Sequence, residues 1–184
     1  MRALVVFESM FGNTATVAQA IADGLATGLD VRLVNVAEAP AEVPADVDLL
    51  VVGGPTHAFG MSRPSTRKSA ADQAGTTMTP VTTGMREWLD AMAVPPSTVA
   101  ATFDTRVHVR WLPGSAARKA QARMHRHGVS LLAPASTFWV EGTPGPLADG
   151  EHHRAFLWGG HLAVLMVERG RTGRSGRPVV QNVS

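Results

Sequence analysis

Five short apolar segments recur along the chain, and none of them alternates strictly between hydrophobic and polar positions. They lie at residues 3–7, 31–36, 49–52, 99–103 and 129–133. Near-continuous apolar runs of this length are typical of strands that are buried on both faces of a parallel sheet. We therefore predict five parallel strands at these positions.

Segments with the helical period separate these strands. The period is clearest after the first strand, where Val17, Ile21 and Leu25 recur every four residues. Further helices are predicted over residues 85–92, 115–126 and approximately 149–168. Alternating strands and helices with short links indicate right-handed crossovers. The pattern therefore predicts an α/β fold with a doubly wound sheet.

Two stretches depart from this alternation. Residues 61–84 are rich in Thr, Ser and Arg, and the segment is longer than an ordinary connection. We expect an irregular loop there, of the kind that often serves as a lid or a binding element. After Gly170 the sequence RTGRSGRPVVQNVS has the character of a tail. We thus expect one domain over residues 1–169 and a basic C-terminal tail over 170–184.

Composition excludes several classes of function. The chain contains no cysteine, which excludes disulfides, thiolate metal sites and cysteine nucleophiles. The first residues already have the pattern of a strand, so we expect no signal peptide. The longest apolar run near the C-terminus, residues 162–167, is far shorter than the ~20 residues that span a bilayer. We expect a cytoplasmic protein that does not associate with membranes.

Charge is distributed unevenly although the formal net charge is only +2. Residues 1–60 contain two Arg and seven acidic residues, a net charge of −5. Residues 61–184 contain fifteen basic and eight acidic residues, a net charge of +7. Such asymmetry affects docking and long-range steering rather than the fold.

The first strand leads into a candidate phosphate site. LVVF at residues 4–7 is followed by SMFGNT at 9–14 and then by the first helical pattern. The first N–H groups of a helix lack intrahelical partners, and the helix dipole adds about half a positive charge there. Ser9, Asn13 and Thr14 add hydrogen-bonding groups, and Gly12 lets the backbone approach a ligand closely. The alternative is an ordinary strand-to-helix turn with Asn13 as N-cap.

A second loop gives the first one a family context. LLVV at residues 49–52 runs into GGPTHAFGM at 53–61. The two loops together resemble the phosphate loop and the first ring-flanking loop of the flavodoxin superfamily, which binds flavin mononucleotide (FMN). Segments 100–106 and 113–119 also resemble flavodoxins, and the ending from 140–147 into the last helix resembles short, actinobacterial-type flavodoxin-like proteins. The resemblance covers residues 1–169 and implies a five-stranded parallel sheet in the order 2-1-3-4-5, flanked by helices.

This resemblance implies three groups of FMN-binding residues. They are Ser9, Met10, Phe11, Gly12, Asn13 and Thr14 in the phosphate loop; Pro55, Thr56, His57, Ala58, Phe59 and Gly60 in the second loop; and Phe103, Asp104, Thr105, Arg106 and Trp111 in the third. Phe59 is expected to stack on the flavin, and Asp104 and Thr105 to bond its pyrimidine edge. Simple packing is the alternative for Phe59 and for Trp111. Glu8 is expected to point away from the phosphate.

The remaining signals do not support other chemistry. Histidines occur in pairs at residues 125 and 127 and at 152 and 153, but no carboxylate set accompanies them, so we expect no metal site. No GxSxG motif supports a Ser-His-Asp hydrolase. The arginines of the tail are expected to form a solvated terminus rather than a nucleic-acid-binding arm.

Three functions remain open. The first is an FMN-binding electron carrier between an NAD(P)H-dependent reductase and an acceptor enzyme, a role that requires no catalytic acid, base or nucleophile. The second is an FMN-dependent NAD(P)H:quinone oxidoreductase, favoured by the second loop and by Phe11, although FDTR at residues 103–106 replaces that family's glycine-rich third loop. The third is a flavin-free interaction module. Each fits a monomer or a dimer.

Overall fold

The structure is a computed structural model of the whole chain. It describes residues 1–56, 60–73, 83–108, 114–142 and 145–175, with the side chains of 69–73 and 173–175 excepted. Within these ranges no helix is long and apolar enough to cross a membrane.

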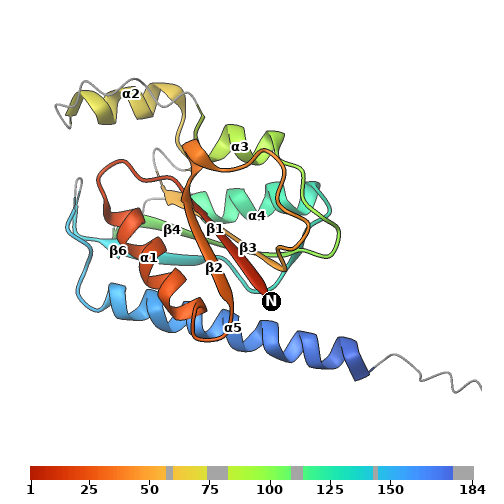
Figure 1. Cartoon of the computed structure of the whole chain (residues 1–184). Coiled ribbons are helices and arrows are strands. Elements are labelled where there is room, and N and C mark those ends of the chain that lie inside the picture. Colours follow the sequence, from red (N-terminus) through yellow and green to blue (C-terminus); the bar gives the residue numbers. More distant parts are fainter. Residues whose placement is uncertain (57–59, 74–82, 109–113, 143–144, 176–184) are drawn as a thin grey trace, which may run out of the picture.

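A parallel sheet forms the centre of the protein (Figure 1). Its strands are β1 (Arg2–Phe7), β2 (Asp30–Asn35), β3 (Leu49–Pro55), β4 (Val99–Val107), β5 (Ser130–Leu131) and β6 (Ser136–Val140). Their order is β2-β1-β3-β4-β5, with β6 also paired to β4, and every pairing is parallel. The predicted α/β fold with strand order 2-1-3-4-5 is confirmed. The carboxyl ends of the strands therefore meet at one edge, where ligands bind in sheets of this type.

The fifth position of the sheet is divided between two short strands. β5 pairs with Val99 and Ala100, whereas β6 pairs with residues 103–107 of the same neighbour. The strand predicted over residues 129–133 is thus only partly formed. Pro134 lies in the interruption, and because proline has no N–H it cannot donate to the ladder.

Four α-helices cover the two faces of the sheet, and a fifth, α2, stands away from it (Figure 1). They are α1 (Asn13–Leu25), α2 (Pro64–Gln73), α3 (Met85–Ala91), α4 (Ala116–Arg126) and α5 (Glu151–Ser175); a short 3-10 turn, η1 (Val36–Glu38), follows β2. Helices α1 and α5 pack on one face, and α3 and α4 on the other. The predicted helices over 85–92 and 115–126 are confirmed, with Ser115 as the N-cap of α4.

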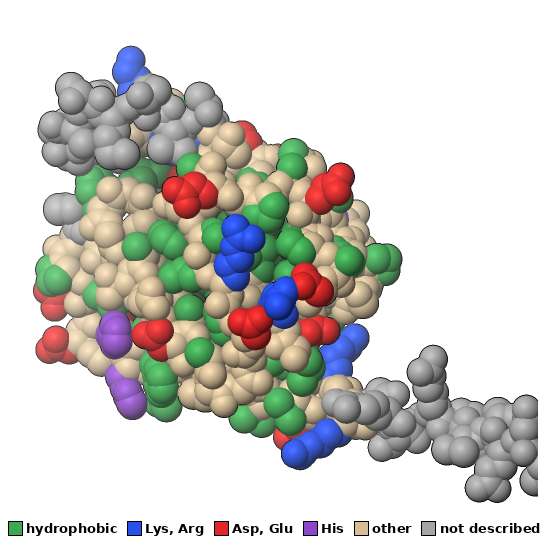
Figure 2. Space-filling model, in the orientation of Figure 1, with side chains coloured by type: hydrophobic (Ala, Val, Ile, Leu, Met, Phe, Trp, Pro, Cys, Tyr) green, Lys and Arg blue, Asp and Glu red, His purple; other side chains and the backbone are tan. Residues whose placement is uncertain are grey.

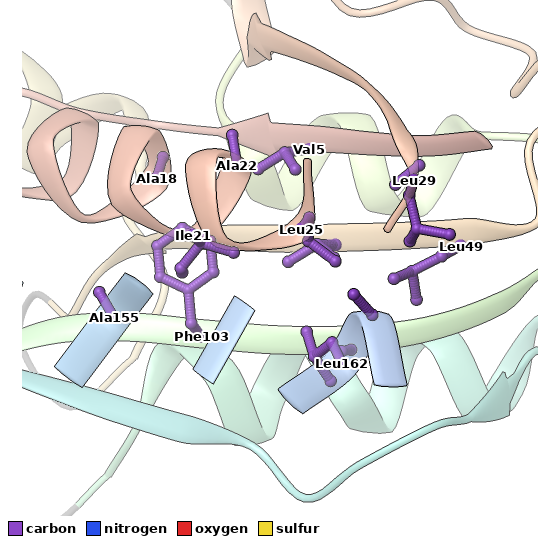
Figure 3. Packing of buried hydrophobic residues seen from close by; sticks show 14 of the residues in the cluster. Val5, Ala18, Ile21, Ala22, Leu25, Leu29, Leu49, Phe103, Ala155 and Leu162 are labelled. Carbon is purple, nitrogen blue, oxygen red and sulfur yellow. The ribbon is translucent and has the colours of Figure 1, made fainter. Parts of the chain in front are cut away.

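The core beneath α1 and α5 is built from buried apolar side chains (Figure 3). Val5 and Phe103 project from the sheet into this layer. Ile21 and Leu25 reach it from α1, and Leu162 from α5, and all five side chains are fully buried. Burial of each such side chain is worth about 1.5–3 kcal/mol.

Glycines let α1 and α5 touch backbone to backbone. A Cβ atom on Gly159 of α5 would lie 2.2 Å from the carbonyl oxygen of Ile21. A Cβ atom on Gly24 of α1 would lie 2.1 Å from the carbonyl oxygen of Phe156. No larger residue fits at either position without separating the helices.

The opposite face has its own core beneath α3 and α4. Leu4 and Val52 of the sheet pack there with Met85, Leu89 and Met124. This second layer fixes the start of α3 and of α4 close to the carboxyl edge of the sheet.

Glu151 joins the start of α5 to β6. Its carboxylate accepts hydrogen bonds from the backbone N–H of Trp139 (2.8 Å) and from Arg154 Nε (2.9 Å). Although partial burial acts to raise it, the pKa of Glu151 lies below its ordinary value because Arg154 and the Trp139 N–H stabilise the charged form. The carboxylate therefore stabilises the folded state at neutral pH.

The structure has one helix that was not predicted, α2, and one that is longer than predicted, α5. Helix α2 forms within residues 61–84, where an irregular loop was expected. It begins at Pro64, a residue suited to the first helical turn, and Thr66 Oγ accepts a hydrogen bond from the N–H of Arg63 (2.8 Å). Helix α5 continues to Ser175, past the predicted end at Glu168, so residues 170–175 of the expected tail are helical. Helix α2 and the last turns of α5 are polar in sequence, so they carry no apolar stripe that the helical period would reveal.

Candidate functional site

The loop between β1 and α1 presents an uncapped helix start. Gly12 occupies the N-cap position with φ of 90°, and no side chain caps the first turn. Asn13 is therefore the first residue of the helix and not its N-cap. A left-handed backbone favours glycine at residue 12, and a Cβ there would meet no atom within 4 Å, so the space above the loop is open. Open space at a free helix N-terminus suits an anion.

Ser9 adds a buried hydroxyl to this loop. Its Oγ atom is inaccessible to solvent and has no hydrogen-bond partner among the described residues. A buried polar group left in this state costs about 1–3 kcal/mol. An oxyanion bound at the loop would give the hydroxyl an acceptor and remove this cost. The residues present thus fit a phosphate group.

Glu8 is turned away from the loop, as the sequence analysis expected. It is buried, and its carboxylate accepts hydrogen bonds from Ser62 Oγ (2.5 Å) and from the backbone N–H of Met85 (2.8 Å). Its negative charge is therefore directed to the start of α3, where it does not compete with an anion in the loop.

A buried polar network continues from Glu8 beneath α2. Arg67 donates to Ser62 Oγ (3.0 Å) and forms an ion pair with Glu87 (3.1 Å). Partial burial acts to raise the pKa of Glu87, but backbone N–H groups, including that of Gly84, and the Arg67 guanidinium hold it below its ordinary value. The network anchors the segment that follows β3. Sequence reasoning missed it because its members are far apart in the chain.

Three loops line one pocket at the carboxyl edge of the sheet. Its walls are Met10, Phe11, Asn13, Thr14, Pro55, Thr56, Thr105, Arg106, Val107, Val140 and Gly142. All three predicted groups of binding residues contribute to this list. Val107, Val140 and Gly142 were not predicted as binding residues, although the last two belong to a segment, 140–147, that contributes to the family resemblance.

Direct hydrogen bonds hold the three loops together. The hydroxyl groups of Thr14 and Thr105 lie 2.7 Å apart in a buried position. The N–H of Thr56 donates to the carbonyl oxygen of Thr105 (2.9 Å). The pocket walls are therefore fixed relative to each other, which lowers the entropy cost of binding a ligand.

Asp104 has a structural position that differs from the predicted one. It is fully buried and does not line the pocket. Its carboxylate accepts hydrogen bonds from the hydroxyls of Thr56 (2.8 Å), Ser115 (2.6 Å) and Thr137 (2.7 Å) and from the N–H of Ala117 (3.0 Å). Asp104 thus ties the second loop, β6 and the start of α4 together instead of facing the pyrimidine edge of a flavin.

Phe103 also differs from its predicted role. Its ring is fully buried in the core beneath α1 and α5, in edge-to-face contact with Phe138 (6.2 Å between centroids) and Trp158 (6.4 Å). A Cβ on Gly53 would lie 2.2 Å from this ring, so the glycine makes room for it. Phe103 supports the site from below and does not contact the pocket.

Arg106 brings a positive charge to the pocket wall. Its guanidinium donates to the carbonyl oxygen of Gly114 (2.6 Å) and lies 5.5 Å from the centre of the Trp139 ring. These contacts hold the charge beside the third loop, and the role of Arg106 towards FMN stays a prediction.

Several predicted positions lie outside the described residues. They are His57, Ala58, Phe59 and Trp111, so the stacking expected of Phe59 and Trp111 stays a prediction. Gly60 is described and is buried against the side chain of Lys119. Across the described part of the chain, no group of three or more His, Cys, Asp or Glu residues is arranged to hold a metal ion.

Comparison with known proteins agrees with this geometry. The flavodoxin family model matches residues 5–87. No curated protein is similar enough in sequence to match. The fold is similar to oxidised Flavodoxin 1 from Bacillus cereus, with a TM-score of 0.63 at 16% identity over 91% of this chain and 98% of that one.

Two further solved structures share the fold. Flavodoxin from Streptococcus pneumonia TIGR4 has a TM-score of 0.63 at 16% identity, covering 92% of this chain and 99% of that one. The flavodoxin, WrbA-like protein from Agrobacterium tumefaciens has a TM-score of 0.57 at 17% identity, covering 91% and 98%. The comparisons thus show a likeness to flavodoxin in sequence over residues 5–87 and in fold over most of the chain.

Proposed function

We propose that the protein binds FMN and transfers electrons between an NAD(P)H-dependent reductase and an acceptor enzyme in the cytoplasm, as a short flavodoxin-like carrier. The observation that carries this proposal is the open, uncapped start of α1 beside the buried, unpartnered hydroxyl of Ser9. When bound, FMN supplies the redox chemistry, and the protein supplies binding, orientation and electrostatics.

The phosphate loop would hold the ribityl phosphate of FMN. Backbone N–H groups at the start of α1 and the Ser9 hydroxyl are the donors, and the helix dipole adds favourable charge. Asn13 and Thr14 line the adjoining pocket. Because Glu8 is bonded to Ser62 and Met85, no carboxylate opposes the phosphate there.

The pocket beside this loop would receive the flavin end of the cofactor. Pro55, Thr56 and Thr105 form part of its walls, and the hydrogen bond from Thr56 N–H to the Thr105 carbonyl oxygen holds two of these loops together. Arg106 places a positive charge on the wall, which favours the added negative charge of a reduced ring. We expect a less negative second reduction step than an acid-lined pocket would give.

An FMN-dependent NAD(P)H:quinone oxidoreductase is the second candidate. It is favoured by the aromatic side chain of Phe11, which lines the pocket at a loop position where many flavodoxins have a hydroxyl. An aromatic wall would suit a flat quinone stacked over the cofactor.

A single reconstitution experiment separates these possibilities. The purified apoprotein is titrated with FMN, and the loaded protein is reduced stepwise and then mixed with NADPH and a small quinone. Two separate one-electron steps without quinone turnover support the carrier. Rapid NADPH oxidation supports the oxidoreductase. A protein that takes up no FMN refutes both and leaves the interaction module.

A further inference from the structure

Four exposed cations border residues 60–63, the segment that follows β3, and lack an acidic partner among the described side chains. They are Arg63, Lys68, Arg118 and Lys119, here called the basic rim, and none of them forms an ion pair within the described part of the chain. Four other cations do form ion pairs: Arg2 with Asp30 and Asp46, Arg67 with Glu87, Arg123 with Asp90 and Arg154 with Glu151. On the face drawn in Figure 2, Lys and Arg side chains lie next to Asp and Glu side chains. The charge of the rim is therefore free to act on molecules that approach.

The basic rim is joined directly to the pocket walls. The N–H of Ala116 donates to Thr56 Oγ (2.9 Å), which places the start of α4 against a pocket residue. Arg118 and Lys119 follow in the first turn of that helix. Nζ of Lys119 would lie 2.6 Å from a Cβ on Gly60, so this side chain lies over the segment that follows β3.

The other half of the rim flanks the same segment. Arg63 immediately precedes α2, and Lys68 lies in its second turn. Between them in sequence is Arg67, whose guanidinium donates to Ser62 and so holds α2 against residues 60–63. Residues 60–63 are thus bordered by α2 and by α4, and each border carries two of the free cations.

Among the described side chains, the acidic groups near the rim are directed inward. Asp104 and Glu8 are buried and bonded to hydroxyl and N–H groups, and Glu87 is paired with Arg67. The exposed acids Glu141 and Asp149 belong to the β6 side of the pocket. The rim is consequently a positive surface beside the flavin position.

We propose that the basic rim docks an acidic redox protein. This inference rests on the proposed function, because docking beside the pocket is productive only when a flavin is there. Unpaired surface cations attract an acidic partner over a Debye length of about 8 Å at physiological ionic strength. Such steering raises association rates by about 10- to 1,000-fold.

The test uses two oxidants of similar kind and opposite charge. The FMN-loaded full chain is reduced and mixed in stopped flow with plastocyanin, an acidic copper protein, or with mitochondrial cytochrome c, a basic haem protein. In each reaction one electron leaves the reduced flavin and reduces the copper or the haem iron. We expect the rate with plastocyanin to fall about tenfold or more as salt rises from about 10 mM to about 300 mM, because screening removes the attraction. The rate with cytochrome c should stay level or rise.

Charge reversal identifies the surface responsible. The double variant Arg118→Glu/Lys119→Glu should lose the salt-dependent advantage of plastocyanin, and an acidic side chain in the first turn of a helix does not oppose folding. The Arg118→Gln/Lys119→Gln variant provides a neutral version. Arg126→Glu, at the far end of α4, is the matched control and should leave both rates within about twofold.

The outcomes separate this inference from the proposed function. Faster oxidation by cytochrome c, or a plastocyanin salt dependence unchanged in the double variant, would overturn the docking surface while the protein still binds FMN. A wild-type chain that takes up no FMN would refute the proposed function, and the docking surface with it.

Discussion

Removal of the Ser9 hydroxyl should have opposite effects on the free protein and on FMN binding. In the protein without ligand, Ser9 Oγ is buried and has no partner among the described residues. Such a group costs about 1–3 kcal/mol, so Ser9→Ala should leave the free energy of unfolding unchanged or raise it by up to about 1 kcal/mol after the small cavity is allowed for.

Binding of FMN should become weaker in the same variant. A hydrogen bond to a charged group contributes about 1.5–3 kcal/mol. Since about 1.4 kcal/mol corresponds to a tenfold change in affinity, the Kd of Ser9→Ala for FMN should rise by about 10- to 100-fold. Quenching of FMN fluorescence measures the Kd, and urea denaturation followed by circular dichroism measures stability.

Thr16→Ala is the matched control. Thr16 lies in the first turn of the same helix, is exposed, and donates to the carbonyl oxygen of Gly12 rather than into the pocket. The Thr16→Ala variant should bind FMN with the affinity of the wild type to within about twofold, a free-energy difference of about 0.4 kcal/mol. The reasoning is refuted if Ser9→Ala binds FMN as tightly as the wild type, or if it destabilises the free protein by more than about 1 kcal/mol.

Three further substitutions test the framework of the site. Asp104→Asn should lower the free energy of unfolding by about 2–4 kcal/mol in urea denaturation, because a buried carboxylate with four donors cannot be replaced by an amide that must itself donate; a loss below about 0.5 kcal/mol would contradict its structural role. Gly159→Ala should destabilise by about 2–3 kcal/mol because its Cβ meets the backbone of α1, whereas Gly160→Ala, whose Cβ is 3.9 Å from the nearest atom, should be neutral or stabilising; equal melting temperatures would disprove the close helix contact. Glu151→Gln should cost about 1–2 kcal/mol at pH 7. Because the folded pKa of Glu151 is lowered, its contribution is present above the unfolded value of about 4.3 and is lost as pH falls through the folded value, so a difference that persists undiminished at pH 2 would refute it.

The parts of the fold that could be predicted carry local signals. Near-continuous apolar runs identified β1, β3 and β4, and the four-residue spacing of Val17, Ile21 and Leu25 identified α1. The phosphate loop could be predicted for the same reason, since a strand, a short polar loop and a helix start are adjacent in the sequence.

The family resemblance did not indicate in which direction each side chain of β4 points. Successive strand residues point to opposite faces, so Phe103 enters the core beneath α1 and α5, and Asp104 faces the start of α4. Thr105 returns to the first face and meets Thr14. The family resemblance grouped these three residues as ligands, whereas only Thr105 lines the pocket: alternation turns Asp104 to the other face, and Phe103, one step deeper in the sheet, is buried in the core.

Helix α2 could not be predicted because its stabilising contacts are polar and distant in sequence. The bonds from Arg67 to Ser62 and Glu87 replace an apolar stripe, and such pairings depend on the finished fold. The same is true of Glu8, whose buried position after a strand gave no indication of its bonds to Ser62 and to the start of α3.

The most direct test of phosphate recognition by the β1–α1 loop is the affinity of the apoprotein for FMN compared with riboflavin, which has the same ring and ribityl chain but no phosphate. Fluorescence quenching gives both dissociation constants under one set of conditions. Several charge-assisted hydrogen bonds at about 1.5–3 kcal/mol each predict that FMN binds at least about 100-fold more tightly. Equal affinities for the two compounds, or no binding of either, would contradict the assignment of this loop as a phosphate site.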